Sequence, residues 1–331
     1  AEKQLQDITD KIKKAGKNKK YDSILGLSGG FDSSYMLHFA IKELGLRPLV
    51  FHVDAGWNTP LAVENINKLV SKLNVELKTE VIDWEEMKDF QLAFFKSGVP
   101  HLDIPQDHAF ISVLYNYAED NGIKYILNGG NISTEVVVNP AAWYYWGTDL
   151  VHINDIIRQF CRAPLKKYPF SHALRHKVYL RYIKNIQVLK LLNYIPYIKK
   201  DAETLLKKEY GFTPYPQKHF ESIMTKFIEG YWLPKRFGYD VRRAQFSSLI
   251  LTKQMSREEA LDRLALPPIP EDEAKALFNQ VAQMLEVSPD ELQSYFAMPL
   301  KTYRDYKHQG YLFDIGARVM YALRLDKLIR R

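Results

Sequence analysis

Short apolar runs alternate with helix-patterned segments through the first half of this sequence, and this alternation restricts the fold more than any other feature. The apolar runs lie at residues 24–27, 48–53, 75–82 and 125–127. Apolar residues recur at the spacing of an α-helix in the segments 32–44, 60–73, 85–96 and 107–121. Strands that alternate with helices in this way predict right-handed βαβ crossovers and a parallel sheet with helices on both faces.

The second half of the 331-residue chain has a different pattern. Strand patterns fade after about residue 146, and long Tyr-, Lys- and Leu-rich stretches follow. Ser256 and Ser288 each precede a helix-patterned segment with acids in its first turn, as N-cap residues do. We therefore expect three parts: a lysine-rich lead-in at 1–20, an α/β domain at 21–150, and a mostly helical substrate and assembly region at 151–331.

Charge and cysteine content bear on the class of protein. Lys and Arg number 46 against 39 Asp and Glu, so the formal net charge is +7. That charge favours anionic partners such as nucleotides, sugar nucleotides, nucleic acid or a membrane surface, without choosing among them. The single cysteine, Cys161, excludes an intrachain disulfide and a Cys-rich zinc site. No apolar run approaches the roughly 18 residues of a membrane span, and the polar first 20 residues contain no signal-peptide core. These features predict a cytoplasmic protein without a membrane span.

Glycine and acid clusters follow three of the predicted strands. They lie at 28–34, 54–57 and 128–135. Ligands of open parallel sheets bind outside the carboxyl ends of the strands. The shared position of the three clusters therefore predicts one nucleotide site at this edge of the sheet.

The most specific motif is SGGFDSS at 28–34, between a predicted strand and a predicted helix. Its two glycines let the backbone approach an anion closely, and the N–H groups at the start of the helix then bind phosphate oxygens. The simpler alternative is a Gly-Gly turn whose Asp and Ser only cap the helix. The motif is not a Walker A loop, because no lysine occurs between Lys20 and Lys42, and it is not a G-x-G-x-x-G fingerprint.

SGGFDSS resembles the SGGxDS loop of the PP-loop ATP pyrophosphatases, which cleave ATP between the α- and β-phosphates. The resemblance implies a five-stranded type of parallel sheet, as in PP-loop and HUP-like folds, and ATP and Mg²⁺ as cofactors. Such enzymes adenylate a carbonyl or carboxylate oxygen and let a nitrogen or sulfur nucleophile displace AMP. The resemblance further implies that Asp32 holds Mg²⁺ and that pyrophosphate is cradled by Ser28, Gly29, Gly30, Ser33 and Ser34.

VDAGW at 53–57 resembles the end of the second strand in the same superfamily, where the chain contacts adenosine. The resemblance makes Asp54 a candidate ligand of the ribose or of the metal. Trp57 either stacks on a ring of the ligand or is a buried aromatic residue.

NGGNISTE at 128–135 resembles the superfamily's loop after the fourth strand, which closes over the α-phosphate. The resemblance places Gly129 and Gly130 at that phosphate and makes Glu135 a second candidate ligand of Mg²⁺. The alternative is a helix-capping role for this loop, with Asn131 or Ser133 ahead of a helical turn.

Blocks in the second half narrow the resemblance to one family. KHFES (218–222), LPKRFGYDVRRA (233–244) and SSLI (247–250) are similar to the N-acetyl sugar amidotransferases of bacterial surface-polysaccharide synthesis, of the WbpG and PseA type. That family converts an acetamido group of a nucleotide-activated sugar into an acetamidino group, in O-antigen, lipopolysaccharide or related glycan synthesis. The resemblance therefore implies an O-adenylated amide that ammonia attacks, with release of AMP and pyrophosphate.

Basic residues in these blocks are candidates to neutralise the α-phosphate, because electrostatic stabilisation is usually the largest catalytic effect. The candidates are Lys218, Lys235, Arg236, Arg242 and Arg243. His219, together with Glu221, is a candidate to orient ammonia or to carry a proton. For any single cation, the alternative is an ordinary solvated side chain.

The resemblance also implies partners. Ammonia is expected from a separate glutaminase, because the sequence has no glutaminase-like segment and no nucleophile elbow around Cys161. Members of the family commonly carry a Cys-containing segment ahead of the PP-loop domain, which suggests zinc, and these 331 residues do not contain it. Nucleic acid is not an expected partner.

Three other functions remain as alternatives. A PP-loop tRNA thiolase would account for the positive charge, but such enzymes often carry sulfur on cysteine pairs or an iron–sulfur cluster, and there is one cysteine here. A carboxylate-amidating ligase similar to asparagine or NAD synthetases differs from the first hypothesis only through the blocks in the second half. A nucleotide-binding regulator would keep the loop without the chemistry, which the acids Asp32, Asp54 and Glu135 disfavour.

Overall fold

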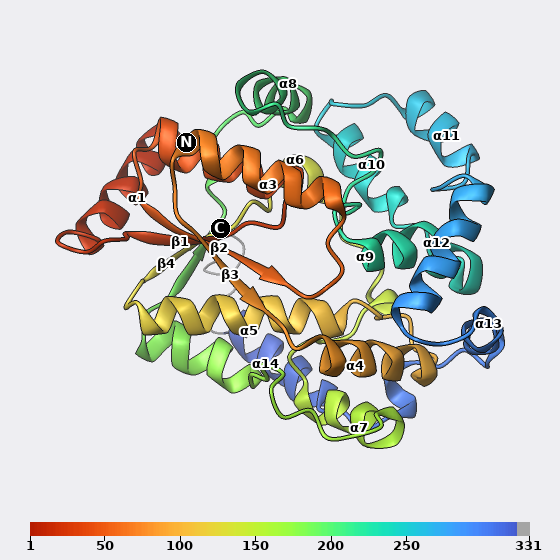
Figure 1. Ribbon diagram of the computed structural model, residues 1–331. Coiled ribbons are helices and arrows are strands. Elements are labelled where there is room, and N and C mark those ends of the chain that lie inside the picture. Colours follow the sequence, from red (N-terminus) through yellow and green to blue (C-terminus); the bar gives the residue numbers. More distant parts are fainter. Residues whose placement is uncertain (323–331) are drawn as a thin grey trace.

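The computed structural model describes residues 1–322, and a five-stranded parallel sheet forms its centre (Figure 1). The strand order is β3-β2-β1-β4-β5. The strands are β1 (Ser23–Gly26), β2 (Pro48–Asp54), β3 (Leu77–Val81), β4 (Tyr125–Leu127) and β5 (Gln187–Leu189). Every neighbouring pair is parallel, so all five carboxyl ends lie at one edge of the sheet. The predicted fold class is confirmed.

Successive residues of the central strands face two separate cores, as the pleat of a strand requires. Ile24 and Leu49 are buried in the core that α4 (Trp84–Ser97) and α5 (Ile104–Asp120) cover. Leu25 and Val50, one residue further along each strand, are buried in the other core. That second core is covered by α1 (Glu2–Ala15), α2 (Phe31–His38), α3 (Pro60–Leu73) and α8 (Lys199–Tyr210), which lie on the opposite side of the sheet from α5 (Figure 1).

Helices make up most of the chain after residue 149, as the sequence predicts. They are α7 (Leu150–Phe160), α9 (Ile223–Phe227), α10 (Arg242–Leu251), α11 (Arg257–Ala265), α12 (Glu271–Met284), α13 (Pro289–Ala297) and α14 (Gly310–Ala322), with π-helical segments at Arg175–Ile183 and Ile228–Phe237. A further π-helical turn, Phe39–Glu43, extends α2, and α6 (Ile132–Glu135) is a single turn. Short 3₁₀ turns lie at Ala141–Trp143, Leu191–Tyr194 and Tyr303–Asp305.

The fifth strand comes from the part of the chain in which the sequence shows no strand pattern. β5 has three residues, and Gln187 and Val188 are exposed, so neither alternation nor an apolar run marks it. It pairs with β4, and the sheet therefore continues past the predicted boundary at residue 150. The division of the chain into three parts stays a prediction.

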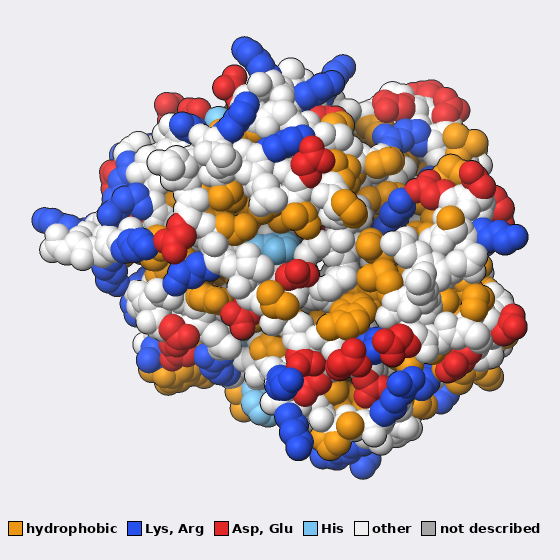
Figure 2. Space-filling view, viewed as in Figure 1, with side chains coloured by type: hydrophobic (Ala, Val, Ile, Leu, Met, Phe, Trp, Pro, Cys, Tyr) orange, Lys and Arg blue, Asp and Glu red, His pale blue; other side chains and the backbone are white. Residues whose placement is uncertain are grey.

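The surface of the face in Figure 2 carries acidic and basic side chains interspersed with apolar ones. The net charge of +7 is therefore not gathered into one basic patch on this side of the molecule. Within residues 1–322, no helix combines the length and the apolar character that crossing a membrane requires.

Candidate functional site

The SGGFDSS loop joins β1 to α2, with Gly30 at the N-cap position of the helix. Its hydroxyl groups hold the loop in shape. Ser28 Oγ lies 3.1 Å from Ser33 Oγ and accepts a hydrogen bond from the Gly30 N–H at 3.1 Å. Ser34 Oγ donates to the Gly30 carbonyl at 2.7 Å and is buried. Ser28, Gly30 and Ser33 line a cavity. Ser34 does not line it and stabilises the loop through its hydrogen bond to Gly30.

Both glycines of the loop are required by their surroundings. Gly29 has a φ of +80°, and a Cβ atom there would lie 2.9 Å from the Ala62 carbonyl oxygen. A Cβ atom at Gly30 would lie 2.3 Å from Glu221 Oε1. The first contact is with the backbone of α3, so a side chain at Gly29 would displace the helix from the loop.

Asp32 is held by partners from three separate segments. Its Oδ1 accepts a hydrogen bond from the Tyr197 hydroxyl at 2.8 Å and from Asn131 Nδ2 at 3.2 Å. Its Oδ2 lies 3.1 Å from Lys218 Nζ. The sequence motifs indicate Asp32 and Lys218, but Tyr197 stands in no motif and is 165 residues from Asp32 along the chain.

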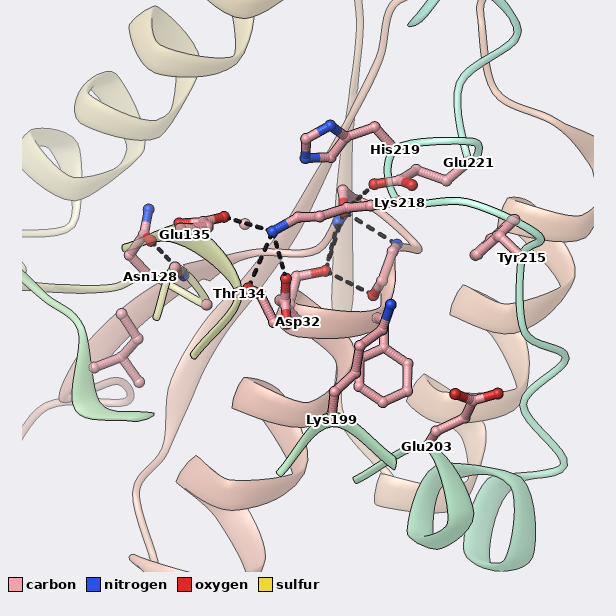
Figure 3. Close-up of a pocket in the computed structure, with 18 of the residues that line it drawn as sticks. Asp32, Asn128, Thr134, Glu135, Lys199, Glu203, Tyr215, Lys218, His219 and Glu221 are labelled. Atoms are coloured by element: carbon pink, nitrogen blue, oxygen red, sulfur yellow. Dashed lines mark hydrogen bonds and ion pairs between the residues drawn. The ribbon is translucent and has the colours of Figure 1, made fainter. Parts of the chain in front are cut away.

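Lys218 joins the two acids that the sequence predicts as metal ligands (Figure 3). Its Nζ lies 2.8 Å from Glu135 Oε1 and donates to Thr134 Oγ1 at 3.2 Å, besides its ion pair with Asp32. Burial alone would lower the pKa of Lys218, but the two carboxylates raise it, so the ammonium group stays charged. Asn131 caps α6 through its contact with the Thr134 N–H, and this cap directs Glu135 to the same point.

The donor set fits Mg²⁺. Two carboxylates of separate segments converge on a single cation, and Mg²⁺ is commonly held by one or two carboxylates together with phosphate oxygens and water. Among the described residues there is no group of three or more His, Cys, Asp or Glu side chains that could hold a metal. Asp32 and Glu135 would therefore hold Mg²⁺ jointly with a nucleotide.

A cavity of about 280 Å³ opens at the carboxyl ends of β1 and β4. It is lined by the SGGFDSS loop, by Asn128–Gly130, by Glu135 and by the segment 214–221. Gly129 and Gly130 line it, and a Cβ atom at Gly129 would lie 2.7 Å from the Asp32 carbonyl oxygen. The two glycine loops therefore lie against each other at the cavity.

Lys199 and Glu203 line the same cavity and belong to no sequence motif. Lys199 is the first residue of α8, and its side chain enters the cavity from the side opposite to Lys218 (Figure 3). Burial lowers the pKa of Lys199 and nearby Asp32 opposes that shift. In the part of the chain that the structure describes, no carboxylate lies within ion-pair distance of Lys199 Nζ. The ammonium group of Lys199 can therefore bind an anion in the cavity.

Comparison with known families agrees with this geometry. Residues 23–99 match the phosphoadenosine phosphosulfate reductase domain, and residues 221–320 match the family described as LPS biosynthesis protein WbpG-like, C-terminal domain. The two matches support the assignment of the chain to the PP-loop superfamily, with a WbpG-like C-terminal domain at residues 221–320. The resemblance stated from the sequence is confirmed at this level, and the matches support an ATP-dependent enzyme related to polysaccharide biosynthesis.

Among solved structures, the chain is similar to an NH₃-dependent NAD synthetase from Campylobacter jejuni. The two are 18% identical, and the match covers 81% of this chain and 99% of that chain with a TM-score of 0.33. Comparison with curated proteins gives no match.

The WbpG-like domain begins at the cavity of the PP-loop domain. Glu221, its first matched residue, accepts a hydrogen bond from Ser28 Oγ at 3.4 Å. His219 lies two residues earlier and also lines the cavity. Its Nδ1 is 3.0 Å from Glu229 Oε1.

Charged groups crowd around His219. Burial alone would lower its pKa, but the charge and hydrogen bond of Glu229 raise it to about 9. Burial raises the pKa of Asp107 to about 6, against the opposing charge of His219, although the Asp107 side chain also reaches solvent. Burial, with Asp107 and Glu229 nearby, raises the pKa of Asp103 well above its usual value. His219 is therefore a cation at neutral pH next to an acidic cluster.

Three of the predicted basic residues do not line the cavity. Lys235 pairs with Glu271 at 3.5 Å, and Arg236 contacts the Phe296 carbonyl oxygen. Arg243 is exposed on α10. Arg242, weighed with them from the sequence, is buried and bonded to Asp240, so it has a structural role. Their positions give no support to the prediction that they act at the α-phosphate.

Asp54 also lies outside the residues that line the cavity. Its Oδ1 accepts hydrogen bonds from the Gly56 N–H at 2.9 Å and from Asn58 Nδ2 at 3.0 Å, which fixes the turn after β2. Trp57 is buried with its ring 4.8 Å from that of Trp84. Of the two alternatives for Trp57, the structure has the buried aromatic residue.

Proposed function

We propose that this chain is an AMP-forming amidotransferase that converts an acetamido group of a nucleotide-activated sugar into an acetamidino group. The observation that carries the proposal is the joint cavity: a PP loop and two candidate Mg²⁺ ligands on one side, and the start of a WbpG-like domain on the other. The proposal of a sugar substrate rests on that domain, because its family is described as LPS biosynthesis protein WbpG-like.

The reaction has two steps. The amide oxygen attacks the α-phosphate of ATP, the bond between the α- and β-phosphates breaks, and pyrophosphate leaves. Ammonia then adds to the activated carbon, the bond from carbon to the AMP oxygen breaks, and AMP leaves with loss of a proton. Adenylation is needed because an amide oxygen is otherwise a poor leaving group.

The residues at the cavity supply binding and charge in this scheme. Backbone N–H groups of the SGGFDSS loop and the start of α2 would bind the leaving pyrophosphate. Lys218 and Lys199 would neutralise charge on the phosphates from opposite sides. Asp32 and Glu135 would hold Mg²⁺, which neutralises phosphate charge when it is bound. His219, a cation beside the acidic cluster, would act in proton transfer.

The thiolase alternative is disfavoured by the surroundings of Cys161. Burial and the neighbouring Asp89 raise the pKa of this thiol to about 12. A thiol with that pKa is not a nucleophile at neutral pH. Cys161 also lies outside the residues that line the cavity. A carboxylate-amidating ligase would use the same ATP chemistry, so the substrate decides between that alternative and the proposal.

The decisive experiment is a mass-spectrometric assay with ATP, Mg²⁺, ammonium chloride and a panel of acetamido sugar nucleotides. AMP together with replacement of a sugar oxygen by NH is the expected result. Success with ammonium and failure with glutamine would indicate a separate glutaminase. AMP formation without a changed sugar, but with an amidated carboxylate, would favour the ligase. Nucleotide binding without AMP under any of these conditions would favour a regulator.

A further inference from the structure

One short segment, residues 218–221, places a cationic and an anionic side chain at two separate points of the site. Lys218 Nζ lies between Asp32 and Glu135, at the point that the proposed function gives to Mg²⁺. Glu221, three residues later, reaches the SGGFDSS loop, at the point given to phosphate. The two side chains therefore match the charges of a magnesium phosphate, with the cation at the carboxylates and the anion at the loop.

The Glu221 carboxylate occupies space that a phosphate would need. Its Oε1 accepts from Ser28 Oγ at 3.4 Å and is 2.3 Å from where a Cβ atom of Gly30 would lie. Because residue 30 is glycine, an anion can approach the backbone there, and in this structure the Glu221 carboxylate occupies that space. Burial raises the pKa of Glu221, with the charge of His219 opposing, so its carboxylate is poorly stabilised where it lies.

Backbone hydrogen bonds anchor the two ends of the segment, whereas its middle is held by the side chains of Lys218, His219 and Phe220. Thr213 N–H donates to Asn65 Oδ1 at 2.9 Å, and the Tyr215 hydroxyl donates to the Gly29 carbonyl at 3.0 Å. At the other end, the Glu221 carbonyl accepts from the Thr59 N–H at 3.0 Å. Between these anchors, among the described contacts, residues 216–220 donate no backbone hydrogen bond. His219 has a φ of +67°, which is unusual for a residue with a side chain.

We propose that residues 214–221 form a strap that closes the site by imitating magnesium phosphate, and that a magnesium nucleotide must displace Lys218 and Glu221 to bind. The proposal rests on the proposed function, since it takes the PP loop as a nucleotide site. Mg²⁺ and the Lys218 ammonium compete for the same carboxylate oxygens, and phosphate and the Glu221 carboxylate compete for the same loop. Once displaced, Lys218 can turn towards the phosphates of the nucleotide. Nucleotide binding would therefore also bring the catalytic charge of Lys218 into place.

The anion half of the strap is tested by calorimetric titration of ATP with excess Mg²⁺ into the full chain. Glu221→Gln keeps the size of the side chain and removes the competing charge, so the Kd for ATP should fall about tenfold, the effect of one close charge pair. Glu209→Gln removes an exposed acid of α8 that lies outside the cavity lining and should change the Kd less than about threefold. An unchanged or higher Kd in Glu221→Gln would overturn the strap.

The cation half is tested with the metal alone. Mn²⁺, a paramagnetic substitute for Mg²⁺, is titrated into the protein without nucleotide and followed by electron paramagnetic resonance. Lys218→Met should bind Mn²⁺ at least about tenfold more tightly than the wild type, because two carboxylates lose their competing cation. Lys218→Arg keeps the charge and should bind as weakly as the wild type. Equal affinity in Lys218→Met and wild type contradicts the strap, whereas failure of every protein to bind ATP contradicts the proposed function as well.

Discussion

The Tyr197 hydroxyl donates a 2.8 Å hydrogen bond to Asp32 Oδ1, which joins the chain ahead of α8 to the PP loop. Tyr197 is buried, and burial together with Asp32 raises its pKa far above the usual value, so it remains a donor at every working pH. The other oxygen of Asp32 faces Lys218. Tyr197 therefore fixes the rotation of the carboxylate that we propose as a metal ligand.

Tyr197→Phe removes this hydrogen bond and little else. A hydrogen bond to a charged group contributes about 1.5–3 kcal/mol, so the free energy of unfolding should fall by about that amount. The apparent Mg²⁺ requirement of AMP formation should rise about tenfold, because Asp32 loses its preset orientation. Tyr194→Phe is a control from the same stretch of chain. Unchanged Mg²⁺ dependence in Tyr197→Phe would mean that Asn131 alone orients Asp32.

Lys199 should bind phosphate, since its charge faces the cavity without a carboxylate partner among the described residues. Lys199→Gln should raise the KM for ATP about tenfold, the loss expected for one charge-assisted contact. Lys200→Gln, an exposed neighbour, should leave KM unchanged. Steady-state AMP release at saturating Mg²⁺ measures both. A fall in kcat alone would place Lys199 at the reacting centre rather than at a binding contact.

The candidate cations from the sequence should separate into two groups when each is replaced. Lys218→Ala should reduce AMP formation at least about 100-fold, as loss of a group that stabilises transition-state charge does. Lys235→Ala and Arg243→Ala should change it less than about threefold, because both residues lie outside the cavity. Single-turnover AMP formation is the measurement. A large loss in Lys235→Ala would mean that the WbpG-like domain moves during the reaction and brings this residue to the phosphates.

Several PP-loop residues singled out from the sequence line the cavity because the signals that indicate them are local. A glycine pair between a strand and a helix, and an acid at a fixed spacing, determine where Ser28, Asp32 and Glu135 lie. The ends of parallel strands must meet at one edge, so separate motifs converge without any knowledge of the second half. For the same reason, the strand at 125–127 and the helix at 60–73 have the predicted bounds.

The other half of the site depends on contacts between distant segments, and the sequence does not record these. Lys199 reaches the cavity, and Tyr197 reaches Asp32, only because the chain returns to the sheet as β5 and then enters α8. β5 has too few residues to show a pattern. Conversely, Lys235 and Arg243 have the right charge in a family-specific block, but neither lines the cavity: Lys235 pairs with Glu271, and Arg243 is exposed on α10. Residue type alone cannot distinguish a cation that lines the cavity from one that lies elsewhere on the surface.

Cys161→Ser should retain AMP formation and amidination at wild-type rates. The thiol is half-buried, its pKa is raised to about 12, and it lies outside the cavity lining. Serine has nearly the same size and can also donate to the Asp89 carbonyl, so the substitution should cost only about 1 kcal/mol of stability. Thermal unfolding checks the fold and the AMP assay checks the chemistry. Loss of activity with an intact fold would revive a sulfur-transfer reaction.

The ion pair between His219 and Glu229 should make stability depend on pH in a defined window. His219 has a pKa raised to about 9 in the folded protein, against about 6.5 when unfolded. A raised pKa stabilises the fold fully below the unfolded value, and the contribution is lost as the pH rises through 9. The difference in unfolding free energy between wild type and His219→Gln should therefore be constant near pH 6, shrink above pH 7 and vanish by about pH 10.

Urea unfolding at pH 6, 7.5 and 10 measures that difference, with the exposed His172→Gln as a control expected to show none. Lys218, Glu221, Asp103 and Asp107 also face this pair, and Asp107, with its pKa raised to about 6, is already ionised across most of the window. The pKa values of Asp103 and Glu221 are raised as well, so the part of the pH dependence that belongs to His219 is the part that His219→Gln removes. A difference that persists at pH 10 would show that the imidazole stabilises the strap by packing rather than by its charge.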